Sequence, residues 1–223
     1  MARLARVVIP HLPHHIIQRG NRRQDVFFCD ADRTLYLELL KKNALKYGIT
    51  FLAYCLMSNH VHLIAIPASM KSLATGIGET HKWYTTQINR QNQWTGYLWQ
   101  GRFHSFILDE PYLYTALRYV ELNPVRAGIV KRAEDYKWSS AHAHISGKQD
   151  ALCDMTHDMV SGIGNWQSFL YDETCSEDYE TLMEKHSQTG RPLGDEPFLR
   201  KIEKITGRML EKKKPGPKKK GIK

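Results

Sequence analysis

A short turn between two apolar segments is the feature that most restricts the fold of this 223-residue chain. Residues Ile49–Met57 and His60–Pro67 are rich in branched and aromatic side chains, which favour β-strands. Only Ser58 and Asn59 separate the two segments, and a connection of such residues is typical of a β-hairpin. The sequence therefore predicts two antiparallel strands that lie next to each other in a sheet.

The segments on either side of this hairpin predict the rest of the fold. The expected order is strand, helix, strand, strand, helix, strand and helix, over His14–Gly20, Asp30–Gly48, Ile49–Met57, His60–Pro67, Lys71–Gln93, part of Tyr97–Asp109, and Glu110–Pro124. We expect Pro124 to end the last helix, because proline cannot donate a backbone hydrogen bond. This order is that of an α+β fold with a ferredoxin-like split βαβ sheet and one added helix. The added helix, which carries Tyr119, can cover the sheet face that the other two helices leave open.

Two histidines, His60 and His62, stand two residues apart in the second hairpin strand. Side chains of a strand alternate between its faces, so both imidazoles project to the same side. Paired imidazoles on a rigid strand can supply half of a metal site. The alternative is a pair of partly exposed histidines that bond to backbone groups, and the spacing alone leaves both interpretations open.

The last predicted helix carries Tyr119 and Asn123 one turn apart, on a shared face. A tyrosine hydroxyl can act as a covalent nucleophile, and an asparagine carbonyl oxygen can join a set of metal ligands. The alternative for Tyr119 is a core aromatic whose hydroxyl lies at the rim. Glu121 is a competing ligand by residue type, but its position two residues along the helix points it away from the Tyr119 face.

The charge of the chain predicts an anionic partner. The net charge is +9, of which residues 211–223 contribute +6, so the rest of the chain binds anions only through local clusters. Arginines beside glycine or aromatic residues suit single-stranded nucleic acid, because rings stack on bases and cations bind phosphates. The alternative is ordinary solvated loops. The two predicted clusters are Gln18–Gln24, with Arg19, Arg22 and Arg23, and Trp99–Ser105, with Gln100 and Arg102.

Several other residues carry simpler expectations. Trp83 and Tyr84 are predicted to lie in the core. His11, His14 and His15 resemble a metal cluster, but we interpret them as an ordinary basic N-terminal segment. The four cysteines form no C-x-x-C pair, and no apolar run reaches the roughly 20 residues of a membrane span. We therefore expect a cytoplasmic protein without a membrane partner.

A change of composition near Gly147 predicts three regions. Residues 1–146 are expected to form the catalytic domain, and residues 147–211 a polar C-terminal accessory region. Within the accessory region, residues 195–210 have the pattern of a small amphipathic helix. Residues 212–223 are expected to be a disordered Lys-rich tail, because like charges repel and proline and glycine disfavour helix.

Three ordered motifs resemble those of a known family. The segments are MSNHVHLI, YLWQGRFHS and YVELNPVRAG, which begin at Met57, Tyr97 and Tyr119. Together they resemble the REP-associated tyrosine transposases, a branch of the HUH single-tyrosine transposases. The resemblance extends from His14 to Ser140, and more weakly over residues 190–208.

This resemblance implies a chemistry and a partner. It implies that His60, His62 and Asn123 bind Mg²⁺ or Mn²⁺, and that Tyr119 attacks a DNA phosphodiester to form a 5′-phosphotyrosine bond. That bond retains the energy needed to rejoin the strand without ATP. The implied partner is single-stranded or hairpin DNA. The group that accepts the phenolic proton is not identified, and His81 and His104 are candidates by residue type alone. The residues expected to contact DNA are Arg19, Arg22, Arg23, Gln100 and Arg102.

Other functions remain compatible with these residues. A non-catalytic hairpin DNA-binding regulator would keep the fold without turnover. A plasmid-type replication initiator would use the same chemistry, but we find no helicase-like extension. A phosphatase acting on small substrates would leave the cationic clusters without a role. Monomer and homodimer both remain open.

Overall fold

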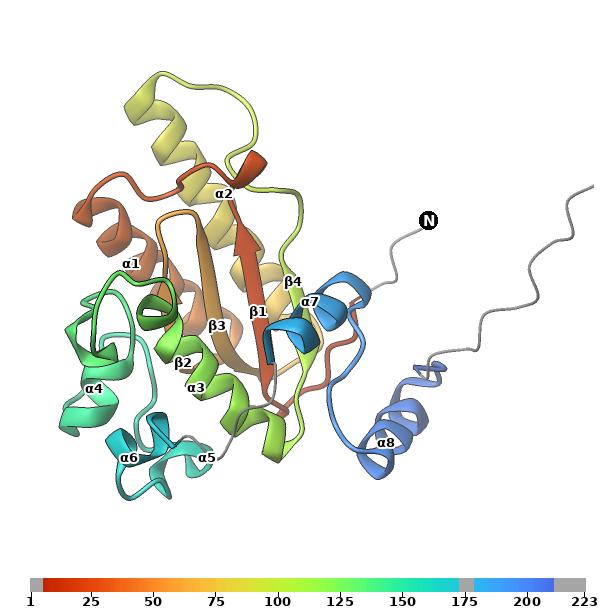
Figure 1. Cartoon of the computed structure of the whole chain (residues 1–223). Coiled ribbons are helices and arrows are strands. Elements are labelled where there is room, and N and C mark those ends of the chain that lie inside the picture. Colours follow the sequence, from red (N-terminus) through yellow and green to blue (C-terminus); the bar gives the residue numbers. More distant parts are fainter. Residues whose placement is uncertain (1–5, 173–178, 211–223) are drawn as a thin grey trace, which may run out of the picture.

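A four-stranded sheet forms the centre of the protein in the computed structural model (Figure 1). The structure describes residues 6–172 and 179–210, apart from the side chains of Glu184 and Gln188. The predicted tail at 212–223 lies outside the described residues. The main elements are β1 (His14–Arg19), α1 (Asp30–Tyr47), β2 (Ile49–Leu56), β3 (His60–Pro67), α2 (Ser72–Asn92), β4 (His104–Ile107), α3 (Glu110–Arg126), α4 (Ala141–Ser146), α5 (Asp158–Ser161), α6 (Trp166–Leu170), α7 (Tyr179–Thr189) and α8 (Glu196–Thr206).

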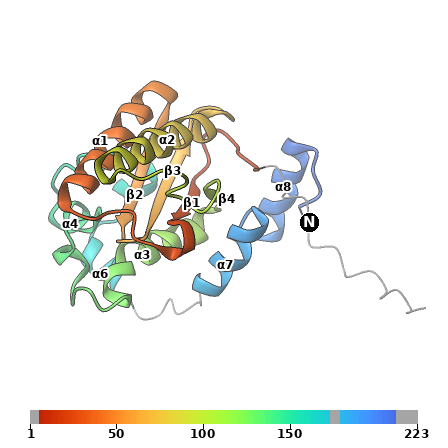
Figure 2. The ribbon, with the colours of Figure 1, turned by 90° about the horizontal axis from the view of Figure 1, so that it is seen from above.

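The sheet has the strand order β2-β3-β1-β4, and all neighbouring strands are antiparallel. Helices α1 and α2 cover one face, and α3 covers the other (Figure 2). This arrangement is the ferredoxin-like α+β fold with an added helix that the element order predicts. Ser58 and Asn59 connect β2 to β3, as expected for the hairpin.

The register of β1 against its two neighbours decides which side chains share the face beneath α3. His60 stands opposite Arg19, and His62 stands opposite Ile17. On the other side of β1, His15 stands opposite Phe106 of β4. Directly opposed residues of antiparallel strands point to the same face. The pairing therefore gathers these side chains under the added helix.

Helix α3 is two residues longer than predicted. Asp109 caps its N-terminus by accepting a hydrogen bond from the backbone of Tyr112, but Pro124 lies inside the helix and does not end it. The missing N–H removes only one bond in the last turn, and the bond from Ala127 N to Asn123 O, which closes the helix, is present at 3.0 Å. The extension places Arg126 on the same face as Tyr119.

The region after residue 146 packs against the preceding elements. Helix α6 contacts α3, and α7 lies along β4 and α3 (Figure 1). Trp166 and Leu170 belong to the same core as the sheet. The boundary predicted at residues 146/147 remains a prediction. The amphipathic helix predicted within 195–210 corresponds to α8, which packs Ile202 into a second small cluster.

A buried carboxylate joins α3 to the segments that follow it in the chain. Glu121 is fully buried and accepts hydrogen bonds from Ser140 Oγ and Trp166 Nε1, and it pairs with His144. Each partner belongs to a segment beyond α3. As expected, Glu121 points away from the face that carries Tyr119.

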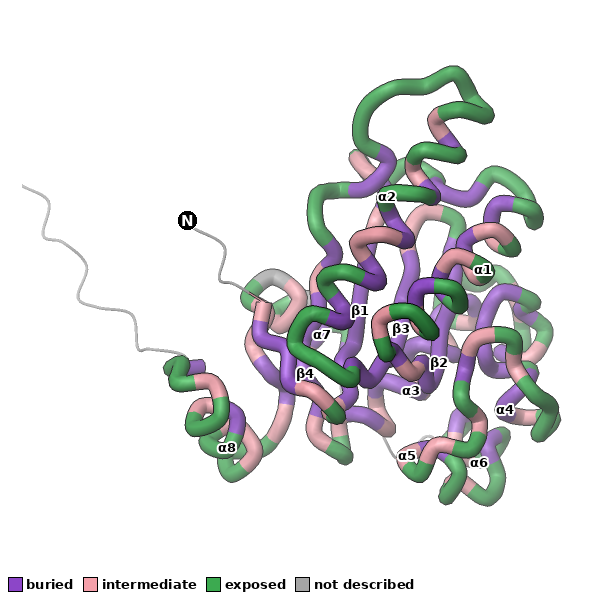
Figure 3. Tube along the Cα trace, turned by 180° about the vertical axis from the view of Figure 1, so that it is seen from behind, coloured by how far each residue is buried: buried purple, intermediate pink, exposed green. Residues whose placement is uncertain are grey.

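Burial contradicts two simple expectations. Tyr84 lies in the core as predicted, but the Trp83 side chain is 52% exposed. His14 and His15 are completely buried, so the interpretation of this segment as an ordinary basic N-terminus is wrong. The reason is that β1 is an inner strand with cover on both faces (Figure 3). Among the described residues, none of the helices combines the length and apolar character needed to cross a membrane.

Candidate active site

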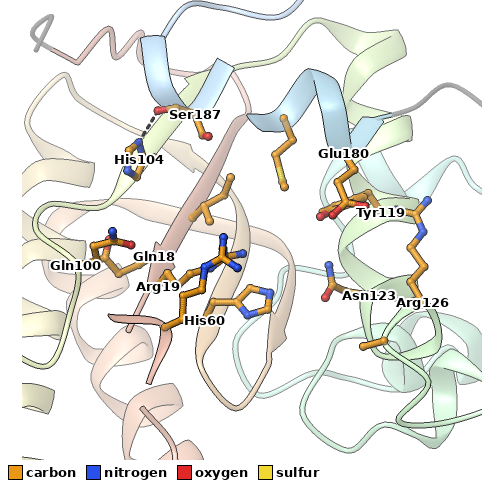
Figure 4. A pocket seen from close by; sticks show the side chains of 14 residues that line it. Gln18, Arg19, His60, Gln100, His104, Tyr119, Asn123, Arg126, Glu180 and Ser187 are labelled. Carbon is orange, nitrogen blue, oxygen red and sulfur yellow. Dashed lines mark hydrogen bonds between the residues drawn. The ribbon is translucent and has the colours of Figure 1, made fainter. Parts of the chain in front are cut away.

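A cavity of about 750 Å³ opens between the end of the sheet, α3 and α7 (Figure 4). It brings together side chains from both ends of the described chain. Its lining carries three arginines and a single carboxylate, so the wall has an excess of positive charge. The lining residues are Ile17, Gln18, Arg19, Arg23, His60, Gln100, His104, Tyr119, Asn123, Arg126, Ala127, Glu180, Met183 and Ser187.

The two predicted histidines lie side by side at this cavity. The ring centroids of His60 and His62 are 4.9 Å apart; His60 lines the cavity and His62 is buried. Burial, the largest cause, lowers the pKa of His60 to about 4. Burial is also the main reason why the pKa of His62 lies well below 6.5. Both imidazoles are therefore neutral near pH 7, which is the form that binds metal ions.

Tyr119 faces this pair from α3. Its ring centroid lies 5.4 Å from that of His62, in an edge-on orientation. Burial, followed by the negative charge of Glu180, raises the pKa of Tyr119 to about 12, although Arg126, Asn123 and Arg19 act in the opposite direction. The Arg126 guanidinium lies 4.8 Å from the centroid of the Tyr119 ring. The hydroxyl is therefore protonated at neutral pH.

Two residues that the sequence did not place at this site complete the surroundings of His62. His15 Nε2 shares a 3.0 Å hydrogen bond with His62 Nδ1, and His15 Nδ1 shares another of 3.0 Å with the Tyr179 hydroxyl. All three side chains are buried. The alternation of β1 could have indicated His15, because it lies on the same strand face as Ile17 and Arg19. Nothing in the local sequence marks Tyr179.

The predicted DNA-contacting residues divide into two groups. Arg19, Arg23 and Gln100 line the cavity, whereas Arg22 and Arg102 are exposed outside its lining. The aromatic residues that flank Arg102 were expected to be available for stacking, and this expectation is wrong. Trp99 and Phe103 are 6% and 4% exposed, because their rings belong to the core.

The two histidines considered as proton acceptors lie in different places. His104 lines the cavity and bonds to the backbone carbonyl of Ser187 on α7. His81 lies on α2, across the sheet from Tyr119, and shares a 2.9 Å hydrogen bond with the Tyr36 hydroxyl. The structure therefore separates His81 from the cavity.

The donor set fits a divalent ion. No group of three His, Cys, Asp or Glu side chains suited to a metal occurs in the described part of the chain. The predicted set instead combines two imidazoles with the Asn123 amide, which lines the same cavity as His60. His60 Nδ1 bonds to Asn59 Oδ1 at 2.6 Å, and His62 Nδ1 bonds to His15. When the Nδ1 proton of each imidazole is donated to its neighbour, the Nε2 lone pair is available as a ligand, and the neighbour fixes the orientation of the ring.

The buried histidines predict that the folded state is less stable in mild acid. Burial lowers the pKa of His14 to about 4, and those of His15 and His81 to about 3. Below pH 6.5 the unfolded chain takes up protons that the folded chain does not. The free energy of unfolding should therefore fall between pH 6.5 and 4, by up to about 1.4 kcal/mol per pH unit for each histidine. Urea unfolding at pH 7 and pH 5 measures the difference in the free energy of unfolding. Equal values at the two pH values would contradict the prediction. His81→Gln removes one buried histidine and should make the free energy of unfolding depend less on pH.

The comparisons with known proteins define the class to which this domain belongs. The family model described as "Transposase IS200 like" matches residues 9–123, which include β1, the histidine pair and Tyr119. Because the match spans more than half of the chain, the protein belongs to this family of transposases.

Two relatives are similar to this chain, and both are described as REP-associated tyrosine transposases. A Haemophilus influenzae protein described as "Putative REP-associated tyrosine transposase" is 27% identical over 119 residues, which cover 48% of this chain and 68% of the relative. The solved structure described as a "REP associates tyrosine transposase bound to a REP hairpin" has a similar fold. The comparison gives a TM-score of 0.56 and a sequence identity of 20%. It covers 72% of this chain and 96% of the chain in the solved structure. The predicted resemblance to REP-associated tyrosine transposases is confirmed.

Proposed function

We propose that the protein cleaves and rejoins hairpin-forming single-stranded DNA through a 5′-phosphotyrosine intermediate on Tyr119. The observation that carries this proposal is the edge-on contact of Tyr119 with His62 beside a cavity rich in arginine. Membership of the transposase family supports strand transfer as the activity. The hairpin bound by the structurally similar transposase supports hairpin-forming DNA as the partner.

We propose His60, His62 and Asn123 as the residues that hold Mg²⁺ or Mn²⁺. The two neutral imidazoles and the amide oxygen would leave other positions for a phosphate and water. When bound, the ion would withdraw charge from the phosphate oxygens and so favour attack by an anionic nucleophile.

Residues of the cavity wall would bind the DNA phosphate and influence the ionisation of Tyr119. Arg19 and Arg23 lie on the cavity wall, where their guanidinium groups would bind and orient the DNA phosphate. The Tyr119 proton passes to water, and the Tyr119 oxygen attacks the phosphorus. The bond between phosphorus and the 3′ oxygen breaks, and that oxygen takes up a proton from water and leaves as a 3′-hydroxyl. Arg126 and Arg19 favour the phenolate, whereas burial and Glu180 oppose it.

A covalent-adduct assay tests this proposal. The purified protein is incubated with Mn²⁺ and a hairpin oligonucleotide labelled on the fragment expected to keep the 5′ phosphate. We expect a labelled protein band on a denaturing gel, absent when EDTA replaces Mn²⁺, and a peptide carrying the label at Tyr119. Tight binding of the hairpin without any adduct would instead support the non-catalytic regulator.

The contact between His15 and His62 predicts an effect on metal affinity. When the His62 Nδ1 proton is donated to His15, the lone pair of His62 Nε2 remains free for a metal ion. His15→Leu removes the acceptor, so we expect Mn²⁺ to bind about 10- to 100-fold more weakly, as measured by calorimetry without DNA. His15→Gln keeps an acceptor near the position of Nε2 and should retain most of the affinity. Equal affinities of both variants and the parent would show that His15 does not position His62.

A further inference from the structure

The turn between β2 and β3 is bonded to the loop that follows β1, residues 20–27. Gly20 N donates to Asn59 O at 2.8 Å, and Val26 N donates to Ser58 O at 2.8 Å. Both are backbone bonds, so they do not depend on the side chains of the turn. They bring the Asn59 side chain against the loop.

This loop holds two consecutive arginines in an unfavourable backbone conformation. The φ angles of Arg22 and Arg23 are 54° and 62°, in the left-handed region that is disfavoured for arginine. The loop is also closely packed, because a Cβ atom at Gly20 would lie 2.1 Å from Gln24 O. A strained conformation persists only where neighbouring contacts enforce it. Because Arg23 lines the cavity, the contacts that hold the loop also help to place its guanidinium there.

The Asn59 side chain supplies one of these contacts and also bonds to the histidine that follows it. Asn59 Nδ2 donates to Arg23 O at 3.1 Å, and Asn59 Oδ1 lies 2.6 Å from His60 Nδ1. A backbone carbonyl oxygen can only accept, so the amide nitrogen must face Arg23 and the amide oxygen must face His60. Since the amide oxygen also only accepts, His60 Nδ1 must carry the proton of the neutral ring.

This tautomer is the one that a metal-binding role of His60 requires. The His60 side chain lines the cavity (Figure 4), and a ligand imidazole must direct an unprotonated nitrogen at the ion. With Nδ1 bonded to Asn59, the free lone pair is on Nε2. Without an acceptor at Nδ1, the imidazole could carry its proton on either nitrogen and could rotate.

We propose that Asn59 is a positioning residue that orients a metal ligand and a phosphate-binding loop at the same time. This inference rests on the proposed function, from which His60 and Arg23 take their roles. An amide is suited to the task because it has a donor and an acceptor on one planar group. Aspartate at this position would keep the acceptor for His60 but would direct an oxygen at the Arg23 carbonyl. Alanine would keep neither bond.

The affinity for Mn²⁺, measured by calorimetry without DNA, tests the bond to His60. Asn59→Ala should bind Mn²⁺ about 10- to 100-fold more weakly. Asn59→Asp still accepts from Nδ1 and should bind Mn²⁺ at least as tightly as the parent, a rescue that a merely structural role would not give. Ser58→Ala is the matched control, because Ser58 is exposed in the same turn and its backbone bond to Val26 is kept. Parental affinity of Asn59→Ala, or equal losses for Asn59→Ala and Asn59→Asp, would overturn the proposal.

The affinity for a labelled hairpin in EDTA, measured by fluorescence anisotropy, tests the bond to Arg23. Asn59→Ala and Arg23→Ala should each weaken hairpin binding by about 3- to 10-fold. The double variant should bind no more weakly than Arg23→Ala, because a loop that has lost its contact with Asn59 no longer presents the guanidinium. Losses that multiply in the double variant would show that Asn59 does not position Arg23.

The outcome for Asn59 is independent of cleavage, because neither affinity measurement requires it. Weakened affinities of Asn59→Ala, together with a parent that forms no covalent adduct, would refute strand cleavage and support the positioning role. Parental affinities of Asn59→Ala, together with a normal adduct in the parent, would refute the positioning role alone. A parent that bound no Mn²⁺ would refute both the proposed metal ligands and the positioning of His60.

Discussion

Tyr119→Phe is expected to abolish the covalent protein–DNA adduct, by roughly a thousandfold or more. The substitution removes only the oxygen that would form the bond to phosphorus. The ring remains, so its contacts with His62 and Arg126 should persist. Hairpin affinity in EDTA should therefore stay within about threefold of the parent, because binding does not require the nucleophile. The labelled denaturing gel measures adduct formation, and fluorescence anisotropy of a labelled hairpin in EDTA measures hairpin affinity.

A neighbouring tyrosine provides the matched control for this experiment. Tyr114 lies on the same helix, where its hydroxyl bonds to Glu110 away from the cavity. Tyr114→Phe should form the adduct at the parental rate. An adduct of normal yield with Tyr119→Phe would mean that another residue attacks the DNA, and the assignment of the nucleophile would be wrong.

Glu121→Ala is expected to lower the free energy of unfolding by about 3–5 kcal/mol. The substitution leaves the buried donors of Ser140 and Trp166 without their acceptor and removes the partner of His144. It also opens a cavity between α3 and the segments packed against it. Chemical denaturation followed by circular dichroism at neutral pH measures the loss.

Two further replacements of Glu121 separate the effect of the lost hydrogen bonds and charge from the effect of the cavity on the free energy of unfolding. Glu121→Gln keeps the hydrogen-bonding groups without the charge and should cost about 1–2 kcal/mol. Glu121→Leu fills the space but leaves the donors unpaired, so its cost should lie between the other two. Parental stability of Glu121→Ala would show that the carboxylate does not fasten the segments that follow α3 to that helix.

The sequence predicts the parts of this protein that depend on short-range periodicity. The two-residue alternation of β3 correctly places His60 and His62 on one face, and the helical period of α3 brings Tyr119 and Asn123 together. The order of strands and helices is sufficient to predict the sheet, because few arrangements accommodate a hairpin between two helices.

What the sequence does not predict depends on tertiary contacts. His15 looks like part of a basic N-terminal segment until the pairing of β1 with β3 and β4 shows that it is enclosed. Trp99 and Phe103 have the composition of a stacking motif, but their rings turn into the core. Exposed rings lie instead at Phe28, Trp94 and Tyr97, which come from two separate segments. Tyr179 reaches His15 only because α7 folds back along β4.

The cavity wall begins with Ile17 and ends with Ser187, so it contains residues from nearly the whole length of the chain. A ribosome releases the histidine pair and Tyr119 well before α7. A nascent chain that stops short of α7 lacks the wall formed by Glu180, Met183 and Ser187. The finished shape of the cavity is therefore reached only after α7 has been synthesised.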